Sequence, residues 1–264
     1  SGQNASSWFV ADFGKEFQGG VILGVQNGRA GQTVEITCGE SLSGNTVGSN
    51  WGWVQQWTLR DGAQRLEQHK YMECRFVTLA FSGEMSLAGF TLSAWKVQYP
   101  WYRGDSHFSS SNATLDAVFE LSRYTLEAGS LDTYTDSNTR ERRPYEADGI
   151  IASTARLLVQ RDFLWGRHSH AWVIEHPTCP VEWQQATPFL GYQDFMATGQ
   201  PDLALAFTEQ MFNRTMISFR DATTGLVKTV DDGSMHYDCS GGHPGMRIID
   251  WMPDTPEFSK GEGD

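Results

Sequence analysis

Residues 135–149 read TDSNTRERRPYEADG and run directly into the apolar stretch GIIASTARLLV at 149–159. Pro144 denies the helical conformation to Arg143 and lacks a backbone N–H, so one continuous helix cannot cover this stretch. We therefore predict a rigid loop from about residue 136 to 145, here called the charged loop, that leads into a buried helix. The stretch carries four carboxylates and three guanidinium groups: Asp136, Glu141, Glu146, Asp148, Arg140, Arg142 and Arg143.

This mixture of charges is typical of acid–base chemistry on a neutral, polyhydroxylated substrate. Such chemistry needs a carboxyl group whose pKa is set by its neighbours, and further polar groups that hold hydroxyls in place. Tyr134 and Tyr145 lie among the charges. Arg140 and Glu141 are adjacent, so we expect that they do not pair as an exposed i,i+4 couple would. The alternative is a solvated network of surface salt bridges, which is the common role of a charged loop.

The composition excludes several classes of function. The chain has 264 residues, 39% of them hydrophobic and 12% aromatic, which suffices for a sizeable core and two domains. Its formal net charge of -12 argues against nucleic acid as a partner, because phosphate backbones are bound by clusters of Lys and Arg. No run approaches the ~20 apolar residues of a membrane span. We expect a soluble protein without a membrane partner, and favour an extracellular or periplasmic location over a cytoplasmic one.

The sequence contains no strong cofactor or metal motif, and we expect neither. The cysteines lie far apart, without a CxxC pair, and nucleotide-binding glycine motifs are absent. His168 and His170 form only an HxH pair and are interpreted as surface residues. Cys38 and Cys74 could form a disulfide in an oxidising compartment, although buried thiols are the preferred interpretation. The disulfide state is left open for all four cysteines: Cys38, Cys74, Cys179 and Cys239.

The first part of the chain has the pattern of an antiparallel β domain. Six short runs of strand-forming residues are separated by Gly, Asn, Asp or Ser: WFVADF, GGVILGV, TVEITCG, VQQWTL, CRFVTLAF and FTLSAWKVQY. Val34, Ile36 and Cys38 alternate with polar residues, as in a half-buried strand. We predict a β-sandwich domain over residues 1–103. Its tryptophans could form a strip for sugar rings, but packing in the core or between domains is the preferred interpretation: Trp51, Trp53 and Trp57.

Residues 104–264 change to a period of 3.6, which predicts helices. Asn112 or Thr114 can cap the first helix, and Gly129 ends it. The helices are predicted at about 112–128, from about 148, at 163–173, at 183–198 and at 201–218. The apolar positions predicted to face a core are Leu115, Val118, Phe119 and Leu126 in the first helix and Ile150, Ile151, Leu157 and Leu158 in the second. So few helix pairs have no obvious way to close a core, which suggests an incomplete domain.

The charged loop resembles a motif of a known enzyme family. The corresponding segment of bacterial α-L-rhamnosidases of glycoside hydrolase family 78 reads roughly TDCPQRERLGWTGD. Residue types and spacing agree at Thr135, Asp136, Arg140, Glu141, Arg142 and Asp148. The opening FVADFGKEFQGGVILGVQNGRAGQTVEI, the helix SHFSSSNATLDAVFELSRYTL and the later IIDWMP are also similar, so the resemblance covers nearly the whole chain. It implies a multidomain protein with an N-terminal β-sandwich followed by part of an (α/α)6 helical barrel.

The resemblance also implies a role for each matched residue. Glu141 is the expected general acid, held protonated by the nearby charges of Asp136 and Asp148 and by partial desolvation. Asp136, Arg140 and Asp148 are expected to bind the rhamnose hydroxyls. Tyr145 stands where the family often has tryptophan and would form an apolar wall. The other expected sugar-facing aromatic residues are Trp183 and Trp251.

The implied activity is that of an inverting glycoside hydrolase that releases terminal α-L-rhamnose from a glycan or glycoside. Inversion needs a second carboxylate ~6.5–9.5 Å away as general base. In the family this base comes from a later barrel loop that no segment of this chain resembles, so the remainder of the barrel is an expected partner. Ser137, Asn138 and Pro144 depart from the family pattern, which bears on leaving-group preference. The alternative is a non-catalytic carbohydrate-binding or structural fragment of such an enzyme.

Overall fold

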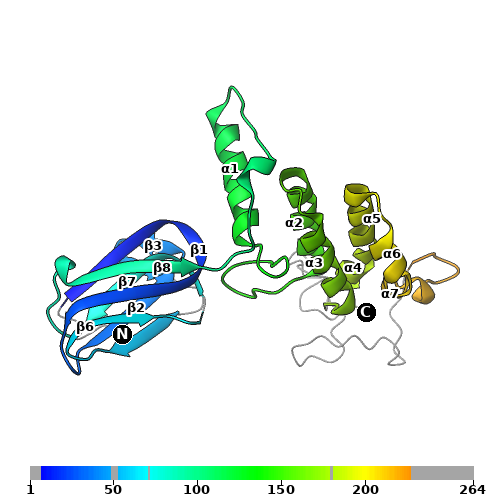
Figure 1. The fold of residues 1–264 in the computed structure, drawn as a ribbon. Helices are drawn as coiled ribbons and strands as arrows, with labels where there is room; N and C mark the ends of the chain where they lie inside the picture. Colours follow the sequence, from blue (N-terminus) through cyan, green and yellow to red (C-terminus); the bar gives the residue numbers. More distant parts are fainter. Residues whose placement is uncertain (1–6, 49–52, 71, 179–180, 227–264) are drawn as a thin grey trace. The chain divides into compact units, whose positions relative to one another are not determined.

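The computed structural model describes residues 7–48, 53–70, 72–178 and 181–226, and the chain divides into two compact units (Figure 1). Unit 1 comprises the β-strands up to Tyr99 together with Glu127–Leu131 and Ser137–Arg142. Unit 2 comprises Pro100–Leu126, Asp132–Asp136 and the chain from Arg143 onward. The structure therefore bears out an antiparallel β unit followed by helices, and each unit is described by itself.

Unit 1 is built on a six-stranded antiparallel sheet in the order β5-β2-β7-β1-β6, with β8 also paired to β1. Strands β3 and β4 form a separate two-stranded sheet. The strands are β1 (Ser7–Gly28), β2 (Thr33–Gly39), β3 (Ser41–Ser43), β4 (Thr46–Gly48), β5 (Val54–Thr58), β6 (Gly62–Glu67), β7 (Met72–Phe81) and β8 (Phe90–Lys96).

Strand β1 organises this sheet, because its two parts have different neighbours. Its first part pairs with β7 as far as Gly19, whereas Ile22 lies between Glu67 of β6 and Ser93 of β8. At Gly19 the backbone of Trp95 comes so close that an added Cβ would overlap its carbonyl oxygen, so only glycine fits. The sequence pattern predicts two strands where β1 is one. It also misses β6, because GAQRLE lacks an apolar alternation.

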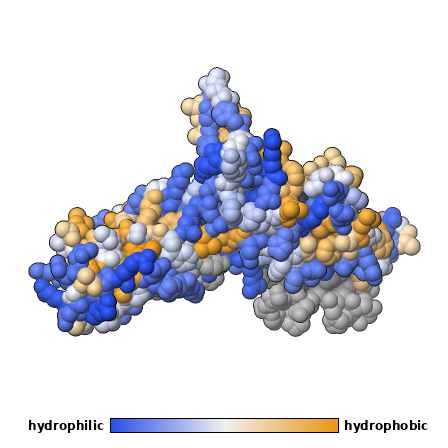
Figure 2. Space-filling model, in the orientation of Figure 1, coloured by the Kyte–Doolittle hydropathy of each residue, from blue (hydrophilic) through white to orange (hydrophobic). Residues whose placement is uncertain are grey.

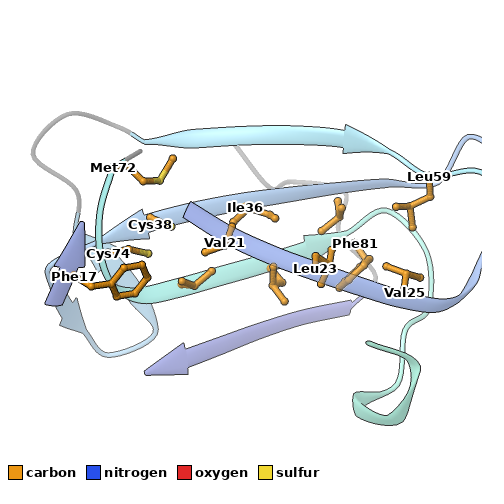
Figure 3. Close-up of a cluster of buried hydrophobic side chains, with 13 residues drawn as sticks. Phe17, Val21, Leu23, Val25, Ile36, Cys38, Leu59, Met72, Cys74 and Phe81 are labelled. Carbon is orange, nitrogen blue, oxygen red and sulfur yellow. The ribbon is translucent and has the colours of Figure 1, made fainter. Parts of the chain in front are cut away.

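The core of unit 1 is made by alternating apolar side chains of β1, β2 and β7 (Figure 3). The predicted inward set of β2 is confirmed, since Val34, Ile36 and Cys38 are at most 3% exposed. Cys38 and Cys74 are buried free thiols, and the hydrogen bond with Cys38, followed by burial, raises the pKa of Cys74. The core further contains Phe17, Val21, Leu23, Val25, Leu59, Met72, Val77, Leu79 and Phe81.

The burial of the tryptophans described in unit 1 favours a packing role over a sugar-binding strip. Trp53 and Trp57 are partly buried and pack against the hydrophobic core. Trp51 lies outside the described residues, as do Cys179 and Cys239.

Unit 2 consists of helices joined by loops. Asn112 caps the first helix as predicted, because its side-chain Oδ1 accepts a hydrogen bond from the backbone N–H of Thr114 at 2.9 Å. The helices are α1 (Ala113–Ala128, whose last two residues group with unit 1), α2 (Glu146–Val159), α3 (Phe163–Glu175), α4 (Val181–Gln185), α5 (Thr187–Thr198), α6 (Asp202–Ala206) and α7 (Thr208–Arg214). Short 3-10 turns lie at Leu87–Gly89, Arg103–Asp105 and Ile217–Phe219.

Two predicted long helices are each broken in the structure. The run at 183–198 divides into α4 and α5, because Pro188 occupies the first turn of a new helix and cannot donate to the preceding one. Its predicted end at Gly199 is confirmed, since this residue has a φ of 69°. The run at 201–218 divides into α6, α7 and a 3-10 turn entered through Met216 at a φ of 59°.

The predicted inward faces of α1 and α2 are only partly correct. Phe119 and Leu126 of α1 and Ile150 and Leu157 of α2 are partly buried, whereas the other four positions are exposed. Leu115 and Val118 of α1 are 51% and 52% exposed, and Ile151 and Leu158 of α2 are 72% and 80% exposed. Figure 2 shows hydrophobic side chains at the surface of the helical part of the chain. Periodicity identifies an apolar stripe, but not whether another element covers it. The buried residues of α2 are small or polar: Glu146, Gly149, Ser153, Arg156 and Val159.

The described helices do not make up a closed barrel. Helices α3, α5, α6 and α7 share a small apolar core, against which Ile150 of α2 packs. Its buried residues are Val173, Ile174, Leu190, Leu203 and Met211. None of the helices in the described part of the chain is long and apolar enough to cross a bilayer.

We predict that Leu23→Ala destabilises unit 1 by about 2–5 kcal/mol, because Leu23 is fully buried and the truncation leaves a cavity in the core. Urea unfolding followed by near-UV circular dichroism measures the loss. Leu87→Ala is the matched control, since Leu87 of unit 1 is 72% exposed and its truncation should change the free energy of unfolding by about 0.5 kcal/mol or less. Equal losses in the two variants would contradict the assignment of the core.

Candidate active site

The charged loop is closed at its base by two hydrogen bonds. The backbone N–H of Asp136 donates to the carbonyl oxygen of Arg143 at 3.0 Å, and the N–H of Arg143 donates to Oδ1 of Asp136 at 3.0 Å. Pro144 follows directly, and the helix α2 begins at Glu146, two residues before its predicted start. The non-helical backbone predicted for Arg143 is therefore confirmed.

The residues predicted for the site are divided between the two units. Arg140 and Glu141 group with unit 1, whereas Asp136, Tyr145, Asp148 and Trp183 group with unit 2. Trp251 lies outside the described residues.

In unit 1, Glu141 forms an ion pair with its neighbour Arg140. Nη2 of Arg140 lies 3.0 Å from Oε1 of Glu141, and the two side chains are 52% and 37% exposed. This corrects the expectation that adjacent residues would not pair. In an irregular loop, unlike a helix, side chains one residue apart are not held on different faces. The pair is partly exposed, so it contributes little to stability and leaves Glu141 in contact with solvent.

Segment 137–142 is held on unit 1 by long-range contacts that no sequence motif predicts. Oδ1 of Asn138 accepts a hydrogen bond from Nε2 of Gln18 at 2.5 Å. The guanidinium carbon of Arg142 lies 4.6 Å from the ring centroid of Trp53, which is a cation–π contact. Arg142 has a φ of 52°, a left-handed conformation that is unusual for a residue with a side chain. The backbone next to Glu141 is therefore set by packing against Trp53.

In unit 2, two of the predicted sugar-facing aromatic residues come together. The rings of Tyr145 and Trp183 have centroids 5.4 Å apart and meet edge to face at 69°. Tyr145 precedes α2 directly, and Trp183 lies in α4. The side chain of Asp148 is half-buried in the first turn of α2.

Glu146 has a role that the sequence analysis did not assign. Its carboxylate is 1% exposed and accepts hydrogen bonds from the backbone N–H of Thr178 at 2.9 Å and from the Thr178 hydroxyl. Burial raises the pKa of Glu146, and the bonds from Thr178 oppose this shift. Nε2 of Gln184 donates to the carbonyl oxygen of Thr178 at 2.5 Å, and Arg214 donates to Gln184 at 3.2 Å. This network ties the start of α2 to the segment that carries Trp183.

The histidines and carboxylates of the described residues form no group of three that could hold a metal ion. His170, interpreted from sequence as a surface residue, is instead 3% exposed, and burial lowers its pKa to about 4. Its ring lies 6.1 Å from that of Tyr134, which packs edge-on against Trp165. His170 is therefore a neutral core residue at ordinary pH.

Comparison with known proteins gives a likeness of fold at low sequence identity. No family model matches the sequence, and no curated protein matches it. A rhamnosidase from Klebsiella oxytoca with rhamnose bound superposes with a TM-score of 0.67 and 15% identity, over 87% of this chain and 52% of that one. A family GH78 rhamnosidase of Bacillus sp. GL1 superposes with a TM-score of 0.71 and 17% identity, over 83% of this chain and 25% of that one.

A third structure extends this likeness. The α-L-rhamnosidase of Streptomyces avermitilis, complexed with L-rhamnose, gives a TM-score of 0.63 at 17% identity, over 83% of this chain and 24% of that one. This chain thus has the fold of part of these rhamnosidases. It spans about half the length of the first and about a quarter of the other two.

We predict that Glu146→Ala loosens the segment around Thr178, because two donors of Thr178 lose their acceptor in a buried place. Amide hydrogen exchange measures this directly, and the Thr178 N–H should exchange at least about tenfold faster, which corresponds to about 1.4 kcal/mol. Glu209→Ala is the control, since Glu209 is exposed on α7. An unchanged exchange rate at Thr178 in Glu146→Ala would refute the bracing role.

Proposed function

We propose that this chain is part of an inverting α-L-rhamnosidase, with a β-sandwich followed by part of an (α/α)6 barrel, that releases terminal α-L-rhamnose from glycans or glycosides. The observation that carries the proposal is the charged loop itself: a half-exposed Glu141 next to Arg140, on a segment held by Asn138 and Arg142. The likeness of fold to rhamnosidase structures supports this reading.

In the proposed reaction Glu141 is the general acid. Its protonated carboxyl group donates to the glycosidic oxygen as the bond to the anomeric carbon breaks. In the free chain Nη2 of Arg140 contacts Oε1 of Glu141 at 3.0 Å. A sugar hydroxyl bound by Arg140 would draw the guanidinium group away and leave the carboxyl group of Glu141 free to face the glycosidic oxygen.

Most of the residues proposed to bind the sugar belong to unit 2. Tyr145 and Trp183 form an apolar wall for the face of the rhamnose ring, and Asp136 and Asp148 accept hydrogen bonds from its hydroxyls. Trp251 is proposed as a further aromatic contact. Inversion also requires a general base that removes a proton from the attacking water. We assign this base to no described residue and propose, from the family resemblance, a glutamate of a later barrel loop.

The exposed apolar surface of unit 2 is consistent with a larger helical domain. Leu121 is 67% exposed on α1, and Phe189 and Met196 are 60% and 63% exposed on α5. Such stripes on a helical surface normally face another element. We propose that further helices of the barrel cover them.

The second candidate function is a non-catalytic carbohydrate-binding or structural fragment of such an enzyme. The observation that favours it is the edge-to-face pair of Tyr145 and Trp183, because an aromatic wall of this kind can bind a sugar ring without any catalytic group.

We predict that Glu141→Gln lowers the turnover of an aryl α-L-rhamnoside by at least about 100-fold, because the amide cannot donate the proton to the leaving group. Release of the aryl alcohol measures this. Glu84→Gln serves as the matched control, since Glu84 is exposed and lies outside the charged loop. Turnover of Glu141→Gln equal to that of the unchanged chain would sink the assignment of the acid.

We predict further that Tyr145→Ala weakens the binding of L-rhamnose about five- to tenfold, because the apolar wall loses one of its two rings. Isothermal titration calorimetry measures the dissociation constant, with Tyr192→Ala, an exposed tyrosine of α5, as the control. Binding without turnover of the aryl rhamnoside favours the non-catalytic function. Absence of both overturns the two candidates together.

A further inference from the structure

Unit 1 contains a buried carboxyl group directly opposite a buried glutamine. Glu73 of β7 pairs across the sheet with Gln18 of β1, and the two residues are 0% and 1% exposed. Their neighbours Phe17 and Cys74 belong to the hydrophobic core, so Gln18 and Glu73 project from the other face of the sheet. Residues on such a face are usually solvated, and these two are covered instead.

The cover includes segment 137–142 and Trp53. Gln18 holds Asn138 by the 2.5 Å hydrogen bond, and Arg142 lies over the ring of Trp53 at 4.6 Å. Arg142 and Trp53 each lower the pKa of Glu73 somewhat. Glu73 is thus the cross-strand neighbour of Gln18, the residue that holds the segment carrying Glu141.

Glu73 is poorly provided with hydrogen-bond donors. Neither of its carboxyl oxygens accepts a hydrogen bond of standard geometry from the described residues, and Oε1 of Gln18 accepts none either. An ionised carboxylate in such a place loses its hydration without replacement, so the neutral acid is favoured. Burial accordingly raises the pKa of Glu73 from 4.5 to about 7.

Some groups around Glu73 raise its pKa and others lower it. Glu40, at the end of β2, raises the pKa of Glu73, whereas the backbone N–H of Glu73 lowers it. Glu16 of β1 is a second half-buried acid, whose pKa is raised by burial and by Glu40 and lowered by a hydrogen bond with Asn138. Lys70 is a further charged residue of this region, with its amino group 4.7 Å from the ring centroid of Trp53.

We propose that Glu73 is a positioning residue for segment 137–142 and hence for Glu141: as a neutral acid it packs beneath the segment, and as a carboxylate it favours opening of the segment to water. The naming of Glu141 as the acid rests on the proposed function, whereas the proton-linked packing of the segment does not. In a hydrolase this linkage keeps the loop closed under the acidic conditions in which a carboxyl group can donate a proton.

The direction of the pH dependence follows from linkage. Glu73 binds its proton with a pKa of about 7 when the segment is closed and near 4.5 when the segment is open and the carboxyl group is hydrated. The closed form therefore binds more protons, so opening is hardest below pH 4.5 and becomes easier as the pH rises through about 7. The difference of about 2.5 between these values sets an upper limit of about 300-fold on the change in the opening equilibrium.

Limited proteolysis with trypsin tests the proposal without requiring any turnover. Trypsin cleaves after Arg140 and Arg142 but not before Pro144, so the two products report opening of this segment. Rates are measured by mass spectrometry from pH 5.5 to 8.5 and divided by those of a free peptide of residues 135–149. We expect the normalised rate of the unchanged chain to rise at least about tenfold, and that of Glu73→Gln to stay constant, because the amide does not ionise.

Two further variants complete the design. Glu73→Met, which has a similar volume and no charge, should also give a flat profile, and it replaces Glu73→Gln if that variant fails to fold. Glu84→Gln, at an exposed site, should keep the rise of the unchanged chain. A flat profile in the unchanged chain, or the same rise in Glu73→Gln, would overturn the proposal. If no variant hydrolyses an aryl rhamnoside, the proposed function fails while the proteolysis result still decides the role of Glu73.

Discussion

The hydrogen-bonded closure between Asp136 and Arg143 is the constraint on which the candidate site depends. With Pro144 it fixes where the charged loop ends and where α2 begins, because the chain can neither continue as helix through Arg143 nor donate a hydrogen bond at Pro144. The residues between Asp136 and Arg143 therefore form a short loop, and this loop carries Glu141. A flexible tail with the same charges would lack a defined geometry for proton transfer.

Local patterns predicted the parts of the fold that depend on local physics. The alternation at Val34, Ile36 and Cys38 gave the correct buried face, because a pleated strand must send every second side chain to the same side. The cap at Asn112 and the end at Gly199 were also correct. Strand β6 was not predicted, because its sequence is largely polar and it is a strand through its pairing with β1.

The interactions that shape the candidate site are long-range, and the sequence contains no signal for them. Gln18 and Asn138 are 120 residues apart, and nothing in either neighbourhood indicates that they bond. The buried face of α2 was predicted only in part for a related reason. Ile150 and Leu157 are partly buried, but the fully buried positions include Ser153 and Arg156. A helix can bury a polar face when neighbouring groups satisfy it, and periodicity weighs only apolar area.

Glu73 and Glu141 show why the protonation of a carboxyl group cannot be deduced from a motif. Glu141, in the recognisable motif, is half-exposed and has a guanidinium group 3.0 Å away. Glu73, in an ordinary strand, is fully buried with few donors, and its neutral form persists to about pH 7. The pKa of a carboxyl group depends on its burial and its neighbours, and a sequence motif does not show these. Under the proposed function both groups matter: substrate would displace Arg140 from Glu141, and the packing of Glu73 and Gln18 would hold the segment that carries Glu141 in place.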